Sequence, residues 1–445
     1  MTTSKTGLFP SIKTEIPGPK GREIIQRDAK VASPSLIKEY ALVADRGQGC
    51  FIDDVDGNRF LDMMAGIAVS STGYGHPHVV GAVKEAVDRV WHICNTDFYT
   101  ESYARLMEKL SSYVPQMGKK KVFLANTGAE AVEGAIKLAR YSTKRKGLMS
   151  FYGGFHGRTM GALSLTASKV KYRDNFGPFI PGVVHGRFPN PMECPSGMSD
   201  EDFGLQAIEE IKTTIFDRIM APTELAAIFV EPIQGEGGYI TPPRSFLKGL
   251  RALCDQHGIL LVFDEIQSGV GRTGHMFAAE YFDVAPDIIT SAKGLGSGLP
   301  IGAIIAKESV MTWGRGTHGS TFGGNNISCA AAVATLEVVE KILPEIRENG
   351  QYLTDTLKQL STKHPIIADV RGPGFMIGME LRDPKTGKSM PEFMGELEQA
   401  AFKKGLLLLG CGQSTIRFAP PLVCGRHEID IAAKILDETL ADLGY

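Results

Sequence analysis

The sequence predicts an α/β protein with a mostly parallel sheet, accompanied by a smaller α+β domain. From Lys121 onward, short apolar runs alternate with segments of helical period, which is typical of a parallel sheet covered by helices. The apolar runs at 225–230 and 259–264 flank an amphipathic segment at 245–257, which predicts a strand–helix–strand crossover. Beyond residue 325 the chain becomes more polar and richer in helical patterns, which predicts the second domain.

Residues 1–65 are predicted to form an N-terminal arm and part of the smaller domain. Residues 1 to about 30 are rich in Pro, Gly and Lys and are expected to pack on another part of the molecule. Residues 50–62 predict a hairpin with Asp56, Gly57 and Asn58 at its turn. Two helices are expected next, from about His78 to Val90 and from about Glu101 to Tyr113.

We expect the large domain to span residues 66–327 and the smaller C-terminal domain to span residues 328–445. In the large domain, further strands are predicted at 122–125, 147–152 and 287–292, with a helix from Glu130 to about Arg140. The smaller domain should begin with a long helix from about Ser328 that stops before Pro344. Its last helix carries Ile429, Ala433, Leu436, Leu440 and Leu443 along one face.

Composition excludes several classes of protein. The chain has 445 residues, 22% charged and 43% hydrophobic, with a formal charge of -2, which is ordinary for a soluble globular protein. There is no basic excess for nucleic acid, no apolar stretch near the roughly 20 residues of a membrane span and no secretory signal. Seven widely spaced cysteines without a CxxC pair predict reduced thiols and a cytoplasmic location.

Asp264 and Lys293 carry the main functional hypothesis. Asp264 ends an unbroken apolar strand, at the sheet edge where open α/β sheets bind their ligands. Lys293 stands 29 residues later, after a second apolar strand and before a glycine cluster, and burial there would favour its neutral, nucleophilic amine. An aspartate for a pyridinium nitrogen and a lysine for a Schiff base are what a pyridoxal 5′-phosphate enzyme requires.

A nucleotide hydrolase is the alternative that Asp264 and Glu265 raise, because an acidic pair after an apolar strand also resembles a Walker B segment. That function requires a glycine-rich phosphate loop as well. The only Gly-Lys-Ser is Gly387-Lys388-Ser389, and Arg382 occupies the position of the first glycine. The nucleotide hydrolase is therefore excluded.

Three further positions suit a bound cofactor, although each also has an ordinary structural explanation. Thr127, Gly128 and Ala129 lie between a strand and a helix start, where backbone N–H groups bind phosphate; a simple tight turn would look the same. Phe155, after a strand, could stack on a flat ring. His156 is expected to be a structural hydrogen bonder. Because His76 and His78 have no third ligand nearby, no metal site is predicted.

Four charged residues are bracketed by apolar or glycine-rich sequence. These are Arg158, Glu231, Glu236 and Arg417. Arginines in such surroundings suit the bidentate capture of substrate carboxylates, and structural ion pairs are an equal alternative for each residue alone.

Five motifs occur in one order and at one spacing that resemble the class III (subgroup II) aminotransferases, the family of the 4-aminobutyrate, ornithine and acetylornithine enzymes. They are Asn-Thr-Gly-Ala-Glu-Ala from Asn126, Phe-His-Gly-Arg-Thr from Phe155, Glu-Pro-Ile-Gln-Gly-Glu-Gly-Gly from Glu231, Asp-Glu-Ile-Gln-Ser-Gly-Val-Gly-Arg-Thr-Gly from Asp264, and Ser-Ala-Lys-Gly from Ser291. The resemblance runs from about Ser33 to the C-terminus. It implies pyridoxal phosphate fold type I, with a seven-stranded-type sheet.

The resemblance also implies a role for each residue around the cofactor. Lys293 would form the Schiff base and then move the proton, while Asp264 would keep the pyridinium nitrogen protonated. Gln267 would reach the phenolic oxygen, and Ile266 and Phe155 would enclose the ring, with His156 close by.

The resemblance further implies how the phosphate is bound. Gly128 and Ala129 would bind the phosphate, and Thr321 would bind the phosphate of the neighbouring subunit, which implies a homodimer. Ala129 replaces the serine or threonine common in the family, so one hydroxyl contact is missing.

For the substrate, the resemblance implies an amino donor and 2-oxoglutarate. Arg417 would bind the α-carboxylate, Glu236 would mask Arg417 when an ω-amine binds, and Arg158 would hold the far carboxylate. Glu231 is a further candidate for this site. Ile67 favours 4-aminobutyrate, because the ornithine enzymes have an aromatic residue there. Asp97 favours a second amino group if it points inward, and the alternative is an N-cap for the following helix.

Three enzymes therefore remain open: a 4-aminobutyrate:2-oxoglutarate aminotransferase, an ornithine or other basic ω-aminotransferase, and an amino acid racemase on the same fold. A cofactor-binding protein without catalysis is a fourth possibility, but no residue needed for catalysis is missing.

Overall fold

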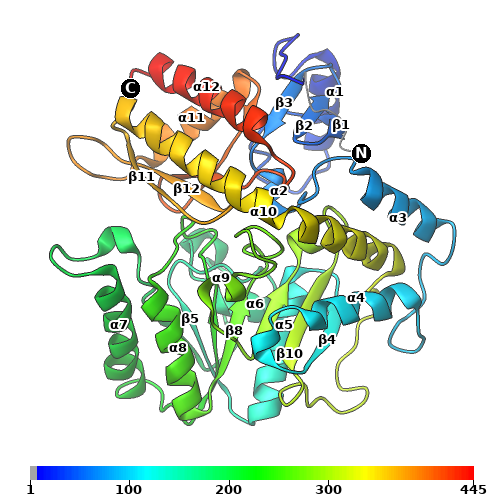
Figure 1. Cartoon of the computed structure of the whole chain (residues 1–445), viewed down its shortest axis with the longest axis vertical. Coiled ribbons are helices and arrows are strands. Elements are labelled where there is room, and N and C mark those ends of the chain that lie inside the picture. Colours follow the sequence, from blue (N-terminus) through cyan, green and yellow to red (C-terminus); the bar gives the residue numbers. More distant parts are fainter. Residues whose placement is uncertain (1–7) are drawn as a thin grey trace.

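A seven-stranded sheet forms the centre of the larger part of the molecule (Figure 1). The computed structural model describes residues 8–445, so the first seven residues of the predicted arm lie outside it. Neighbouring strands are parallel from β9 through β8, β7 and β5 to β6, whereas β10 is antiparallel to both β9 and β4. In spatial order the strands are β4 (Lys120–Ala125), β10 (Gly302–Lys307), β9 (Ile288–Ser291), β8 (Leu260–Asp264), β7 (Leu225–Val230), β5 (Gly147–Phe151) and β6 (Val183–Gly186). The predicted α/β class is confirmed.

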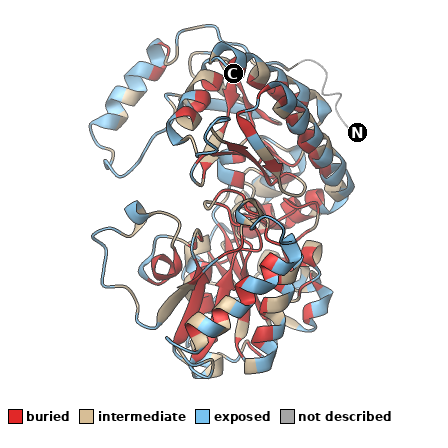
Figure 2. Ribbon diagram, turned by 90° about the vertical axis from the view of Figure 1, so that its left-hand side faces the viewer, coloured by how far each residue is buried: buried red, intermediate tan, exposed pale blue. Residues whose placement is uncertain are grey.

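Both faces of this sheet are buried by helices (Figure 2). Successive side chains of a strand point to opposite faces, so Ile228 packs with the core of α8, whereas Phe229 packs with the core of α5. The predicted crossover is confirmed, because β7, α8 and β8 follow one another and the two strands are parallel. The helices of this part are α4 (Glu101–Ser112), α5 (Gly128–Thr143), α6 (Met160–Leu165), α7 (Asp200–Glu210), α8 (Arg244–His257) and α9 (Ala278–Phe282).

A second, antiparallel sheet lies in the smaller part of the molecule, with two helices beside it (Figure 1). Its order is β11 (Ile367–Arg371), β12 (Ile377–Leu381), β15 (Thr415–Phe418) and β14 (Leu409–Cys411). The helices are α11 (Pro391–Lys403) and α12 (Arg426–Asp442). This sheet matters for function because β15 carries Arg417.

The third sheet combines strands from the N-terminal region with one strand, β13, from the C-terminal region. The predicted hairpin at 50–62 is confirmed as β2 (Phe51–Asp54) and β3 (Arg59–Asp62), and β3 also pairs in parallel with β13 (Leu406–Leu407). The remaining elements of this region are β1 (Ala44–Gln48), α1 (Pro19–Ala29), the short turn α2 (Ala65–Ala68) and α3 (Pro77–Val87). The domain boundaries expected after residues 65 and 327 stay predictions.

The helix expected to stop before Pro344 continues through it, so that prediction was wrong. Helix α10 runs from Asn326 to Lys363. A proline inside a helix removes one backbone hydrogen bond and crowds the preceding turn, but packing on both sides of Pro344 outweighs this cost. Leu336 is buried before the proline and Leu353 after it, and α10 packs against α3, α4 and α12.

Among residues 8–445, no helix is both long enough and apolar enough to cross a membrane. The predicted cytoplasmic location stays a prediction.

Candidate active site

A cavity of about 410 Å³ lies at the carboxyl ends of the parallel strands, beside the start of α5. Phe155 follows β5, Glu231 follows β7, Asp264 ends β8 and Lys293 follows β9. Because the carboxyl ends of parallel strands meet at one edge of the sheet, residues far apart in sequence line one cavity. The predicted site residues on its wall are Gly128, Ala129, Phe155, His156, Arg158, Glu231, Asp264, Ile266, Gln267 and Lys293.

Asp264 is held by three donors in the buried base of the cavity. Its Oδ2 lies 2.7 Å from His156 Nδ1, and its Oδ1 accepts hydrogen bonds from Thr290 Oγ1 and the Ile266 backbone N–H, both at 3.2 Å. Burial alone would lower the pKa of His156, but the hydrogen bond to Asp264 raises this pKa above its usual value. The buried Asp264 carboxyl group is thereby fixed in one orientation, which suits it to hold a cationic ring nitrogen.

Lys293 follows β9 and begins a single 3₁₀ turn, Lys293–Leu295. Its φ is 40°, in the left-handed region that side chains other than glycine rarely adopt, so the backbone here is strained. Burial lowers the pKa of the Lys293 ammonium below its usual value, although the Glu236 carboxylate acts in the opposite direction. A lowered pKa increases the fraction of neutral amine, which is the nucleophilic form.

The buried Arg417 and the half-buried Glu236 form an ion pair, with Glu236 Oε1 2.6 Å from Arg417 Nη1, and the charges of both act on the pKa of Lys293. Burial would raise the pKa of the Glu236 carboxyl, but the Arg417 guanidinium holds it below its usual value. The Nε of Arg417 is also buried and has no hydrogen-bond partner within the described part of the chain. Arg417 thus has donor capacity that Glu236 does not use, as expected of a residue that receives another carboxylate.

Glu231 links the loop of Phe155 to the loop of Glu236. Its Oε1 accepts a hydrogen bond from the Phe155 backbone N–H at 2.8 Å, and its Oε2 accepts one from the Gly235 N–H at 3.0 Å. Burial raises the pKa of Glu231 to about 7. In this structure Glu231 orients two loops of the cavity, a contribution that the sequence did not reveal.

The N-terminus of α5 faces the cavity at Gly128 and Ala129. The Thr127 side chain caps the helix by accepting from the Glu130 backbone N–H at 3.1 Å. A Cβ on Gly128 would lie 2.8 Å from Ile266 Cδ1, so a larger residue would require the Ile266 side chain to move. The first N–H groups of a helix lack partners within the helix and attract anions, which makes this wall suited to a phosphate.

Five predicted site residues lie outside the cavity wall: the paired Glu236 and Arg417, and also Ile67, Thr321 and Asp97. Ile67 is 40% exposed, and Thr321 is exposed in the loop before α10. Asp97 is exposed in a turn, and the alternative that it caps α4 was wrong, because α4 begins at Glu101 after Thr100. The capping prediction failed because the chain continues for three more residues before it turns helical.

The short turn that carries Ile67 has an unexpected conformation. All four of its residues, Ala65 to Ala68, have positive φ, and that of Ile67 is 67°, which is costly for a β-branched residue. Asp62 holds the entry to the turn: its Oδ1 accepts from the Met64 and Ala65 backbone N–H groups at 2.8 and 3.0 Å, and its Oδ2 accepts from Tyr74 at 2.6 Å. Strain maintained in this way at the edge of a site is typical of functional positions.

Tyr172 belongs to the site but gave no signal in the sequence. The Arg158 guanidinium lies 4.9 Å from the centre of its ring, and the Phe155 ring lies 5.5 Å away. Burial raises the pKa of Tyr172, as does the Glu236 carboxylate. Its segment, Val170–Tyr172, is an isolated 3₁₀ turn in a loop, so no periodic pattern pointed to it.

Comparison with known proteins adds independent findings. The family described as aminotransferase class-III matches residues 34–440. The chain is 38% identical to an alanine/serine racemase of Pyrococcus horikoshii, over 98% of this chain and 93% of that protein. It is 39% identical to a 4-aminobutyrate aminotransferase of Escherichia coli, over 94% and 98%. A solved (S)-enantioselective omega-transaminase from Thermomicrobium roseum has a TM-score of 0.88 at 29% identity, covering 98% of this chain and all of that one.

Proposed function

Because the chain belongs to the class-III aminotransferases, which are transaminases that use pyridoxal 5′-phosphate, we propose that it moves an amino group from 4-aminobutyrate or a related ω-amino acid to 2-oxoglutarate. The two half-reactions would follow one another in a ping-pong mechanism. The observation that carries this proposal is the Glu236–Arg417 ion pair beside Lys293.

The residues of the cavity fit pyridoxal phosphate. Asp264 offers a fixed carboxylate for the ring nitrogen, and Lys293 offers the amine that would hold the group covalently. Ile266 and Phe155 offer apolar surfaces, and the start of α5 at Gly128 and Ala129 offers backbone donors for the phosphate. When bound, the group supplies an electron sink for the bond that breaks at the amine carbon.

The chain's own residues would then hold and move protons and carboxylates. The Lys293 amine would carry the proton between the substrate carbon and the carbon where the substrate is attached. Arg158 would hold the far carboxylate of the substrate, and Tyr172 would steady Arg158 through its ring. His156 keeps the Asp264 carboxylate in place throughout.

The Glu236–Arg417 pair would let one site accept two kinds of substrate. An ω-amine such as 4-aminobutyrate has no α-carboxylate, so Arg417 would stay paired with Glu236. Glutamate and 2-oxoglutarate have one, and it would replace Glu236 on Arg417. Arg417 suits this exchange because its buried Nε is without a partner in residues 8–445, and we call the exchange the carboxylate gate.

A half-reaction panel tests the proposal. The pyridoxal form would be mixed separately with 4-aminobutyrate, ornithine, lysine and several α-amino acids, and its conversion to the pyridoxamine form would be followed by absorbance. We expect 4-aminobutyrate to give the largest kcat/KM among the donors other than glutamate. A larger value for ornithine would favour the basic ω-aminotransferase and overturn the assignment that rests on Ile67. An Asp97 side chain that reaches the substrate would also favour ornithine, because its carboxylate would bind the second amino group.

A racemase is the second candidate, favoured by the similarity to an alanine/serine racemase over 98% of this chain. Racemisation requires the proton to return to the substrate carbon from the opposite side. L-alanine would be incubated with the holoenzyme without 2-oxoglutarate, and its enantiomeric excess would be followed. Loss of enantiomeric excess faster than pyridoxamine forms would favour the racemase over the aminotransferase.

We also propose a homodimer in which Thr321 reaches the neighbouring cavity. Segment 91–99 lies against the loop of Thr321, because Asn325 Nδ2 donates to the Trp91 carbonyl at 3.0 Å and Thr96 Oγ1 donates to the Ser320 carbonyl at 3.4 Å. Large apolar side chains are exposed there, namely Trp91, Phe98, Tyr99 and Phe322, as expected for a buried interface. Mixing inactive Lys293→Ala with impaired Thr321→Ala subunits should raise the activity of the hybrid above that of either parent, and no gain would contradict the shared site.

A further inference from the structure

The loop that carries Glu236 is closed at its base. Gln234 and Ile240 exchange two backbone hydrogen bonds, from the Gln234 N–H at 3.0 Å and from the Ile240 N–H at 3.1 Å. We call residues 234–240 the gate loop. Its tip contacts the antiparallel sheet of β11, β12, β15 and β14, so a segment of the large part of the molecule is held by the small part.

Arg371, the last residue of β11, holds the backbone of the gate loop. Its Nε donates to the Tyr239 carbonyl at 3.1 Å, and its Nη2 donates to the Gly238 carbonyl at 2.6 Å. On the other side of the tip, the Gly412 N–H donates to the Glu236 carbonyl at 2.9 Å. These bonds fix the main chain at Glu236 while leaving its carboxylate to Arg417.

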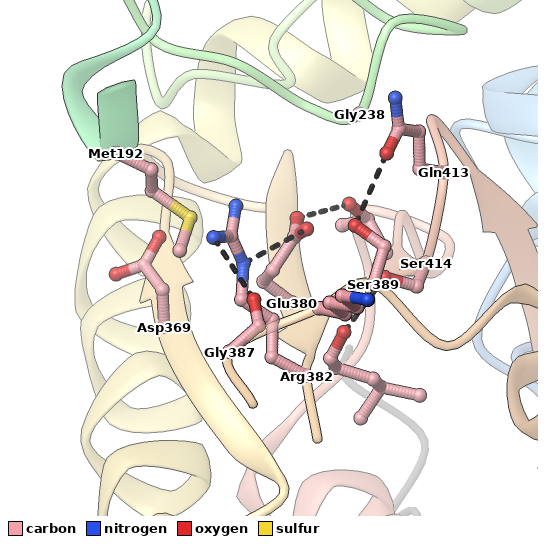
Figure 3. A network of polar contacts seen from close by, with 12 residues as sticks. Met192, Gly238, Asp369, Glu380, Arg382, Gly387, Ser389, Gln413 and Ser414 are labelled. Atoms are coloured by element: carbon pink, nitrogen blue, oxygen red, sulfur yellow. Dashed lines mark hydrogen bonds and ion pairs between the residues drawn. The ribbon is translucent and has the colours of Figure 1, made fainter. Parts of the chain in front are cut away.

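Two carboxylates of the small sheet hold the Arg371 guanidinium in place. Its Nη1 lies 2.8 Å from Asp369 Oδ2, and its Nη2 lies 2.9 Å from Glu380 Oε2. The Thr415 hydroxyl donates to the same Glu380 oxygen at 2.6 Å. A planar guanidinium held by two carboxylates keeps its remaining donors in fixed directions. Asp369 and Glu380, both labelled in Figure 3, are register partners on the paired strands β11 and β12.

The gate loop packs closely against the sheet at two glycines. A Cβ on Gly238 would lie 3.2 Å from Thr415 Oγ1, and one on Gly412 would lie 2.9 Å from Gly238 Cα. The opposite end of the loop is tied to the cavity, because the Tyr239 hydroxyl donates to Gln267 Oε1 at 2.8 Å. The main chain of the loop cannot shift without breaking these contacts.

We propose that Arg371 is a positioning residue for the carboxylate gate: it fixes the backbone of the gate loop so that Glu236 pairs with Arg417 and leaves it by side-chain rotation alone. This inference rests on the proposed function. With the backbone already ordered, forming the Glu236–Arg417 pair costs only the freedom of one side chain. Without Arg371 the pair would also have to order the loop, and the gate would shift toward its open state.

The variant Arg371→Lys tests this, because it keeps the positive charge and loses the planar fork. The holoenzyme would be titrated calorimetrically with glutarate, a dicarboxylate that has no amine or keto group to react. We expect glutarate to bind about tenfold more tightly, the effect of weakening one charge-assisted hydrogen bond in the competing pair. The kcat/KM for 4-aminobutyrate should fall while that for glutamate holds or rises, a split that general destabilisation would not produce.

Three further variants make the result specific. Thr415→Val keeps the branched shape and removes the hydroxyl that holds Glu380, so it should act in the same direction to a smaller extent. It also decides the question if Arg371→Lys does not fold. Arg382→Gln is the matched control, because Arg382 lies near the same Glu380 carboxylate (Figure 3), with its Nε 3.8 Å from Oε1, and makes no contact with the gate loop among the described residues. Because Arg382 Nε makes no hydrogen bond to Glu380, whereas the Thr415 hydroxyl does, Arg382→Gln should leave glutarate binding unchanged.

Glu236→Ala separates the failure of this inference from the failure of the proposed gate. Glu236→Ala should tighten glutarate binding, and adding Arg371→Lys to it should change nothing further, because Arg371 acts through Glu236. If Glu236→Ala tightens glutarate binding but Arg371→Lys and Thr415→Val do not, the positioning role is overturned and the gate stands. If Glu236→Ala has no effect, the gate is wrong, and the role of Arg371 falls with it.

Discussion

Glu231→Gln should change how the stability of the protein depends on pH. The unfolded carboxyl loses its proton near pH 4.5, whereas burial raises the pKa of the folded Glu231 to about 7. Between these values the folded state binds more protons than the unfolded state, so the free energy of unfolding falls as pH rises. The effect amounts to about 1.4 kcal/mol for each pH unit. Glu231 should therefore lower the free energy of unfolding by about 3 kcal/mol between pH 4.5 and pH 7.

Urea unfolding of the wild type and of Glu231→Gln at a fixed protein concentration would measure this. Burial also raises the pKa of Glu265 and of Glu398 to about 7, so only the difference between wild type and variant isolates Glu231. As pH rises from 4.5 to 7, the free energy of unfolding of Glu231→Gln should increase relative to that of the wild type by about 3 kcal/mol.

Glu236→Gln is the control with the opposite sign. Because Arg417 holds the pKa of Glu236 below its usual value, its stabilising contribution is complete above the unfolded pKa and is lost only as pH falls below it. Its substitution should leave the slope between pH 4.5 and 7 unchanged. A flat difference between wild type and Glu231→Gln over the same window would refute the reasoning for Glu231.

Three other substitutions have definite expected outcomes. Lys293→Ala should abolish the visible absorption band of the lysine-bound cofactor and slow amino transfer by at least about 100-fold; survival of the band would place the attachment elsewhere. Ile67→Tyr should shift the ratio of kcat/KM for ornithine over 4-aminobutyrate upward by about tenfold, and an unchanged ratio would remove Ile67 from the substrate site. Pro344→Ala should raise the free energy of unfolding by about 1 to 2 kcal/mol, measured by urea unfolding; an unchanged or lower value would contradict the idea that the proline costs α10 stability.

The large sheet could be predicted because its strands are buried on both faces. Leu225–Val230 is buried at every position, and such runs stand out from the polar segments around them. Once Asp264 and Lys293 fall at the ends of two such strands, the position of the cavity follows from the sheet alone. The motifs that cross this edge are local, so their order and spacing could be seen without a structure.

The gate loop and the turn at Ile67 could not be predicted in the same way. Arg371 contacts the loop across more than a hundred residues of chain, and no local pattern marks an arginine that binds carbonyl groups. The left-handed turn of Ala65 to Ala68 contradicts the preferences of its own residues. Tertiary contacts, such as the Asp62 hydrogen bonds, impose it. Pro344 inside α10 is a third case in which packing overrides a local preference.

Under the proposed carboxylate gate, substrate choice would depend on the contact between two sheets as much as on the cavity wall. Lys293 and Asp264 belong to the large sheet, whereas Arg417 lies on β15 of the small sheet, and Glu236 joins the two through its ion pair with Arg417. A substitution that shifts β11, β12 or β15 would move Arg417 and Arg371 together, whereas Lys293, which would hold the cofactor, follows β9 of the large sheet and would not move with them. Variants in the small sheet should consequently change which carboxylates are accepted before they change the visible absorption of the cofactor. If both change in parallel in variants such as Thr415→Val, the two functions are not separated in this way.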